Sequence, residues 1–210
     1  MSNGVPQRGL RIALPIVAAL FIGGLIGAWV ADSNQPLGGV GNADGSLGGE
    51  FTLEGLYGPV SLSDYRGKVV VIYFGFLGCT NYCDTSMAVL KAAFDRLPYQ
   101  QVNELQALMI SIDPWRDDIR SLDAYTRSWH PKIAGLIGTQ QEIAKLTRRY
   151  GAWYERTESE DGGDYEYLHT SRFFIIDRDG ELVDAMRHST TPNELAARLK
   201  QYTGAQVDQG

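Results

Sequence analysis

The chain contains two cysteines, and they lie close together. Cys79 and Cys83 stand in the segment GFLGCTNYCDTS, with three residues between them. Two thiols at this spacing can form a structural disulfide, exchange disulfides with a substrate, or bind a soft metal ion as thiolates. The spacing alone does not decide among these uses, because the common dithiol redox motif, C-x-x-C, is one residue shorter.

A buried strand and a helix are expected to position the two thiols. The apolar run from Val69 to Phe76 predicts a strand buried on both faces. Residues 84–86, Asp-Thr-Ser, have N-cap chemistry for a helix that runs toward Leu97. If this helix starts early, Cys79 and Cys83 share one face, and their sulfurs lie at its N-terminus. The helix dipole there favours the thiolate form.

The rest of this region alternates strands with helices, which predicts parallel β-α-β crossovers and a late antiparallel hairpin. Together with the strand that precedes the cysteines, the pattern predicts an α/β, thioredoxin-like mixed sheet flanked by helices. The expected strands are Leu105–Ile112, Ala134–Gly138, Ser171–Ile176 and Glu181–Met186; the expected helices are Asp117–Ser128, Gln140–Tyr150 and one beginning near Pro192; Glu50–Tyr57 is expected to form an accessory hairpin.

His169 precedes the fourth core strand, in the segment YLHTSRFFIID. In a thioredoxin-like fold this loop lies beside the cysteine loop and usually carries a cis-proline, but no proline occurs between Pro131 and Pro192. A lone histidine is often an ordinary surface residue. Beside two thiolates, however, its imidazole would complete a three-ligand site open to ligand exchange, which a carrier of Cu(I) or Cu(II) requires.

Three separated segments resemble the Sco/SenC family of copper-binding, thioredoxin-like proteins: YFGFLGCTNYCDTS, SIDPWRD and LHTSRFFIIDRDG. The resemblance covers roughly residues 50–203 and implies that Cys79, Cys83 and His169 are copper ligands. It also implies a role for Asp113 outside the ligand set, where it would orient His169 or assist copper binding. Asp113 can equally be a cap or turn residue ahead of Pro114.

The sequence departs from the family pattern beside each cysteine. Thr80 and Asp84 stand where the family usually has proline. We therefore expect a less rigid loop and an added negative charge, which would raise thiol pKa values or favour a cation. The acidic segment 155–166 is expected to be a solvated loop, with docking of a basic partner as its alternative.

The other histidines and the nearby methionines are not expected to bind metal. His130 and His188 have no neighbouring thiol in the sequence and are interpreted as surface residues. Met87 and Met109 fall in apolar runs and are interpreted as core residues.

The N-terminal region predicts a membrane anchor. Residues 12–31 carry no charge, and at about 1.5 Å per residue a helix of this length spans a hydrocarbon core of roughly 30 Å. Arg8 and Arg11 precede this run, so residues 1–11 are expected in the cytoplasm and the remainder outside it. The alternative is a cleaved signal peptide. The expected organisation continues with a flexible Gly-rich linker, 32–49, and a copper-binding domain, 50–205.

Three functions remain open at this stage. The family resemblance implies a copper metallochaperone that serves the binuclear copper centre of cytochrome c oxidase subunit II, or another cuproprotein. The anchor, without an Arg/Ser-rich transit segment, places it in a bacterial inner membrane with its domain in the periplasm. The alternatives are a thiol-disulfide reductase that uses Cys79 and Cys83, and a module with an inert disulfide. A net charge of −6 argues against a nucleic-acid partner.

Overall fold

The computed structural model describes residues 46–79, 82–158 and 165–204. Within those ranges no helix is long and apolar enough to cross a membrane. The predicted anchor and most of the predicted linker lie outside the described residues. Gly48 and Gly49, at the end of that linker, already contact the domain: the Gly48 amide donates to the Arg149 carbonyl (2.8 Å), and the Gly49 carbonyl accepts from the Tyr150 hydroxyl (2.9 Å).

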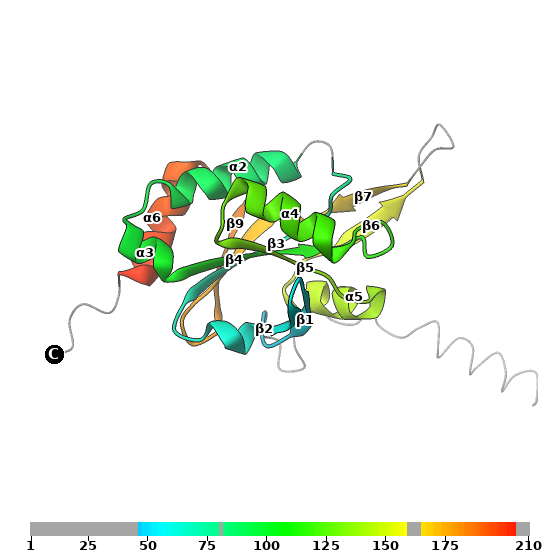
Figure 1. Cartoon of the computed structure of the whole chain (residues 1–210), viewed down its shortest axis with the longest axis horizontal. Coiled ribbons are helices and arrows are strands. Elements are labelled where there is room, and N and C mark those ends of the chain that lie inside the picture. Colours follow the sequence, from blue (N-terminus) through cyan, green and yellow to red (C-terminus); the bar gives the residue numbers. More distant parts are fainter. Residues whose placement is uncertain (1–45, 80–81, 159–164, 205–210) are drawn as a thin grey trace, which may run out of the picture. The chain divides into compact units, whose positions relative to one another are not determined.

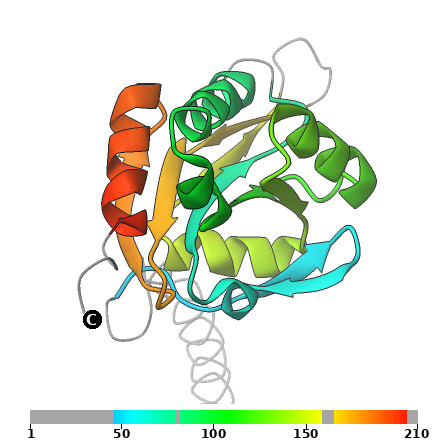
Figure 2. The same ribbon diagram turned by 60° about the vertical axis from the view of Figure 1, so that its left-hand side comes forward.

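A five-stranded mixed sheet forms the centre of the domain, in the order β5-β4-β3-β8-β9 (Figures 1 and 2). β3 pairs in parallel with β4 and antiparallel with β8, so the end of β3 and the start of β8 lie at the same edge of the sheet. Its strands are β3 (Val69–Gly75), β4 (Leu105–Ser111), β5 (Ile133–Leu136), β8 (Arg172–Ile176) and β9 (Leu182–Arg187).

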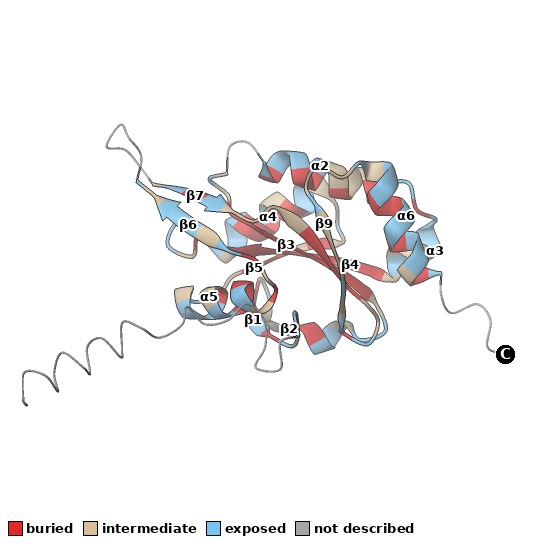
Figure 3. Ribbon diagram, turned by 180° about the vertical axis from the view of Figure 1, so that it is seen from behind, coloured by how far each residue is buried: buried red, intermediate tan, exposed pale blue. Residues whose placement is uncertain are grey.

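Helices cover both faces of this sheet, as the apolar runs predict. Figure 1 shows α2, α4 and α6 over one face and α5 with the β1–β2 hairpin over the other. In Figure 3 the buried residues follow the central strands and the inward sides of the helices, and every residue of β3 is buried. The helices are α2 (Cys83–Phe94), α3 (Tyr99–Asn103), α4 (Ile119–Trp129), α5 (Gln140–Arg149) and α6 (Pro192–Thr203).

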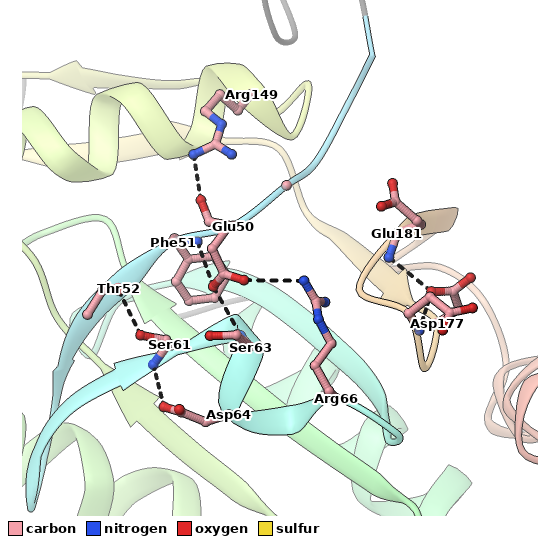
Figure 4. A network of polar contacts seen from close by, with 12 residues as sticks. Glu50, Phe51, Thr52, Ser61, Ser63, Asp64, Arg66, Arg149, Asp177 and Glu181 are labelled. Atoms are coloured by element: carbon pink, nitrogen blue, oxygen red, sulfur yellow. Dashed lines mark hydrogen bonds and ion pairs between the residues drawn. The ribbon is translucent and has the colours of Figure 1, made fainter.

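The predicted accessory hairpin is present but extends beyond the predicted residues 50–57. Its strands are β1 (Thr52–Gly55) and β2 (Gly58–Ser61), and a short 3-10 helix, η1 (Leu62–Tyr65), follows. Glu50 fastens it to the domain (Figure 4): its carboxylate accepts from the Ser63 amide (3.0 Å) and pairs with Arg66 (3.4 Å). The Glu50 carbonyl accepts from the Arg149 side chain (2.7 Å). The hairpin therefore begins at a fixed point beside α5.

The predicted core elements are confirmed within a few residues at each end, but two expectations are wrong. Residues 84–86 do not cap α2, because that helix begins at Cys83 and its N-cap, Tyr82, makes no side-chain cap hydrogen bond. The ends of the acidic segment 155–166 are not loop: β6 (Tyr154–Thr157) and β7 (Glu166–His169) form an antiparallel hairpin.

The close approach of β5 to α4 provides a test of the packing. A Cβ atom at Gly135 would lie 2.7 Å from Cγ of Leu122 and 3.0 Å from its carbonyl carbon. Gly135→Ala should therefore lower the free energy of unfolding by about 1–3 kcal/mol in urea denaturation, because the helix must shift away from the strand. Gly78→Ala is the matched control, since its Cβ would meet its nearest neighbours at 3.5 Å. Equal stability of the two variants would contradict this packing.

Candidate metal centre

Two thiols and one imidazole converge just beyond the C-terminal end of β3, the central strand of the sheet. One ligand atom from each of Cys79, Cys83 and His169 lies within 4.8 Å of the other two. The two cysteines are free thiols, with Cys83 buried and Cys79 half-buried. The structure thus brings together the three residues that the sequence singled out as ligands.

The backbone explains why residues so distant in sequence meet. Cys79 follows β3 in a turn, where its amide donates to the Phe76 carbonyl (3.3 Å), and Cys83 is the first residue of α2. His169 ends β7, and Thr170 and Ser171 separate it from the start of β8 at Arg172. Because Tyr73 of β3 pairs with Phe173 of β8, the segment that follows β3 and carries the cysteines lies beside the segment that precedes β8 and carries the histidine. The condition under which both cysteines would share a helical face is not met, because α2 starts only at Cys83.

The two thiols differ in protonation. Hydrogen bonding from Cys83, against an opposing effect of burial and with a smaller contribution from the nearby His169 imidazole, lowers the pKa of Cys79 to about 3. The proximity of Cys79 and burial raise the pKa of Cys83 well above its ordinary value. The Tyr73 hydroxyl lies 3.9 Å from the Cys83 sulfur. The half-buried sulfur is therefore the thiolate, and the buried sulfur is the thiol that donates to it.

His169 presents a free nitrogen to this pair. Its Nδ1 lies 3.2 Å from the Thr170 carbonyl oxygen, which can only accept, so Nδ1 carries the proton in that contact. Nε2 is buried and has no hydrogen-bond partner among the described residues. The rings of Phe76 and Tyr73 pack edge-on against the imidazole, with centroids 5.9 Å and 6.4 Å away. The ring is thus held in place by its neighbours, and Nε2 is the ring nitrogen left available as a ligand.

Asp113 is fully buried just after β4. Its side chain contacts Arg116 and Tyr165, and no contact with His169 is seen among the described residues. Its carboxylate pairs with Arg116 and accepts a hydrogen bond from the Tyr165 hydroxyl (2.8 Å). The Arg116 guanidinium lies 3.9 Å from the centre of the Tyr165 ring and 5.9 Å from that of Phe76. Asp113 therefore connects to His169 through Arg116 and Phe76. The sequence did not indicate Arg116, although it stands in the SIDPWRD segment.

A second buried carboxylate fastens the cysteine loop. Asp117 accepts from the Leu77 amide (3.1 Å) and from the Ser111 hydroxyl (2.6 Å), and so ties the start of the loop to the end of β4. Burial raises its pKa above the ordinary range. Sequence reasoning placed Asp117 at a helix start, but α4 is capped by Asp118, whose carboxylate accepts from the amides of Arg120 and Ser121.

The remaining predicted residues are distributed as follows. Met87 and Met109 are buried, which confirms them as core residues. Asp84 is exposed and accepts a hydrogen bond from the Tyr125 hydroxyl (2.7 Å). His130 packs against the Phe94 ring. His188, interpreted as a surface residue, is half-buried and lines the same cavity as Cys79, a proximity that its position in the sequence did not indicate. Thr80 lies outside the described residues.

The donor set fits a soft metal ion. With metal–sulfur bonds of about 2.3 Å, two sulfurs on one ion stand up to about 4.6 Å apart. The separations here, within 4.8 Å, need only a small adjustment. Thiolate and neutral imidazole are ligands that suit copper and zinc.

Comparison with known proteins agrees with this donor set. The model of the family SCO1/SenC matches residues 40–204. The chain belongs to this family. Protein SCO2 homolog, mitochondrial, of Bos taurus is 28% identical over 97% of this chain and 80% of its own. Protein SCO1, mitochondrial, of Saccharomyces cerevisiae is 32% identical to this chain, in an alignment that covers 77% of this chain and 57% of the yeast protein.

The solved structures give the same fold. Bradyrhizobium japonicum ScoI with copper bound superposes with a TM-score of 0.67 at 33% identity, over 75% of this chain and 99% of its own. The comparisons show the thioredoxin-like SCO1/SenC fold. The convergence of Cys79, Cys83 and His169 is seen independently, in the geometry of this chain.

The unequal thiols can be tested by alkylation of the reduced, metal-free chain. A pKa of about 3 keeps Cys79 deprotonated at any pH above that value. Its alkylation rate by iodoacetamide should therefore stay nearly constant from about pH 5 to about pH 8, whereas an ordinary thiol slows about tenfold per pH unit below its pKa. Peptide mapping identifies the modified cysteine. Cys83→Ala removes the main cause of the shift and should restore a pH-dependent rate; a pH-dependent rate in the unsubstituted chain would contradict the assignment.

Proposed function

We propose that the chain is a membrane-anchored copper metallochaperone. It delivers copper to the binuclear copper centre of cytochrome c oxidase subunit II, or matures that centre. Cys79, Cys83 and His169 hold the ion, and residues 12–31 tether the domain to a bacterial inner membrane, on its periplasmic side. The observation that carries the proposal is the buried Nε2 of His169, without a partner among the described residues and next to two thiols.

The chemistry is ligand exchange. Three protein ligands leave copper open to a further ligand, so an acceptor thiolate can bind before a donor ligand departs. Cys79 is half-buried and Cys83 is buried, so the acceptor can reach the Cys79 side of the ion first. Membership of the Sco family supports the acceptor class, because a solved member is described as belonging to a family of cytochrome c oxidase assembly proteins.

The pair of unequal thiols also favours a second candidate, a thiol-disulfide reductase. The Cys79 thiolate would attack a disulfide of the acceptor and release one thiolate. Cys83 would then attack the mixed disulfide, release the second acceptor thiol and leave a Cys79–Cys83 disulfide. The protein loses two electrons in this cycle, so an external dithiol must reduce it again. Both candidates need the reduced pair.

Anaerobic titration of the reduced chain with Cu(I), against a chromophoric competitor, tests the metallochaperone. One tightly bound copper per chain is expected. Cys79→Ala and Cys83→Ala should each lose the ability to take copper from the competitor, because only one of the two sulfur ligands remains. His169→Ala should weaken binding by about 10–100-fold. His130→Ala is the matched control and should bind normally, since His130 packs against Phe94.

Binding no stronger than that of the competitor in the unsubstituted chain would overturn the metallochaperone. The reductase would then be tested by the reduction potential of the pair and by its exchange with a peptide disulfide.

A further inference from the structure

A cavity of about 550 Å³ opens beside the thiolate. Cys79 and His169 form part of its wall, so it lies at the exposed side of the candidate metal centre. The ends of β7 and β9 and the start of β8 supply most of the remainder, including Arg172 and Arg187. Neither the ligand set nor the packing of the core accounts for this surface.

Two arginines in this cavity lie directly opposite one another on adjacent strands. Arg172 of β8 and Arg187 of β9 are direct partners in the antiparallel register, so their side chains project from the same face. Like charges in this position destabilise a sheet. Neither residue has a recorded ion pair among the described residues, whereas the neighbouring strand residue Asp184 pairs with Arg198 (2.9 Å). The described residues that line the cavity include no aspartate or glutamate to balance this charge.

The rim of the cavity is apolar and exposed. Tyr82, Trp153 and Leu168 line it and are 55%, 56% and 56% exposed. The His188 ring packs edge-on against Tyr82 with centroids 5.2 Å apart, which supports that ring from the side. Exposed aromatic side chains beside arginines are the composition that protein interfaces concentrate at their centres.

We propose that this surface docks the copper-exchange partner through an acidic segment of that partner. The occupant is a protein segment with two carboxylates for Arg172 and Arg187 and an apolar side chain for Trp153 and Leu168. Arginine pairs with carboxylates in a bidentate manner, which fixes orientation as well as charge. A segment bound there would bring the partner's own ligands to the exposed side of Cys79. This inference rests on the proposed function and names the partner's chemistry.

The first test measures docking without metal or thiol exchange. The probe is a synthetic peptide with two glutamates flanking a leucine and without cysteine, titrated into the reduced, metal-free full chain at low salt. We expect binding that weakens with salt and shifts the NMR signals of residues that line the cavity. The double variant Arg172→Gln/Arg187→Gln should bind about tenfold more weakly. Lys200→Gln, an exposed charge in the last turn of α6, is the matched control and should bind normally.

Charge reversal completes this test. Arg172→Glu/Arg187→Glu should lose the acidic peptide and gain a peptide in which lysines replace the glutamates. The melting temperature of the Gln double variant should be equal to or above that of the unsubstituted chain, because a cross-strand repulsion is removed. A lower melting temperature would assign the arginines to folding and overturn the proposal.

Two further outcomes would also overturn it. An affinity for the acidic peptide that is the same in the double variant and in the control would show that the arginines do not dock carboxylates. A dimer in sedimentation experiments that the same substitutions dissociate would assign the surface to a second copy of the chain. Cu(I) titration separates the docking proposal from the metallochaperone proposal. Unchanged copper affinity together with lost peptide binding in the Gln double variant supports docking. Failure of the unsubstituted chain to bind copper refutes only the metallochaperone.

Discussion

The antiparallel pairing of β3 with β8 is the constraint on which the site depends. It places the segment that leaves β3 and the segment that enters β8 at one edge of the sheet, with Tyr73 opposite Phe173. Cys79 and His169 each lie within a few residues of that edge. Since both strands are buried in the centre of the sheet, sliding one against the other would move core side chains to the wrong face. The positions of the ligands are thus determined by the register of the core.

Within that frame, unequal burial decides how the two thiols share one negative charge. Two adjacent thiolates without a cation would repel each other, and the buried one would pay the larger desolvation cost. The pair avoids this by leaving the proton on Cys83 and the charge on Cys79. A bound cation removes the repulsion, so ligation of a metal by both sulfurs must release the proton of Cys83. The resting site is therefore prepared for a cation, and it does not carry the full charge of its metal-bound state.

The parts that sequence reasoning predicted are those with strong periodic signals. The central strands are continuous apolar runs, and Pro192 marks the start of the last helix at the position observed. The β6–β7 hairpin lacked such a signal, because half of its strand residues are exposed and the charged residues Glu155, Arg156 and Glu166 interrupt its apolar ones.

The convergence of Cys79, Cys83 and His169 could be predicted because thiols and imidazoles are rare in this chain, whereas the residues around them could not. Arg116 and His188 join the site only through tertiary contacts, and residue types such as these are common on any surface. The link from Asp113 to His169 has the same origin: it passes through Arg116 and the Phe76 ring, and no spacing in the sequence encodes it.

In the proposed role, a carrier must hold its ion and also give it up, and the two requirements fall on different residues of the site. Cys83 lies inside the core at the start of α2, and His169 is wedged between aromatic rings, so neither moves without disturbing packing. Cys79 sits in a turn, half exposed, at the wall of a cavity that opens outward. Release through the Cys79 side therefore costs little structural change. Because an exposed soft ligand would also exchange with any thiol in solution, selectivity must come from the surface around it. In the proposed role, the charge of Arg172 and Arg187, which has no ion-pair partner among the described residues, is a feature of that surface that can distinguish one partner from another.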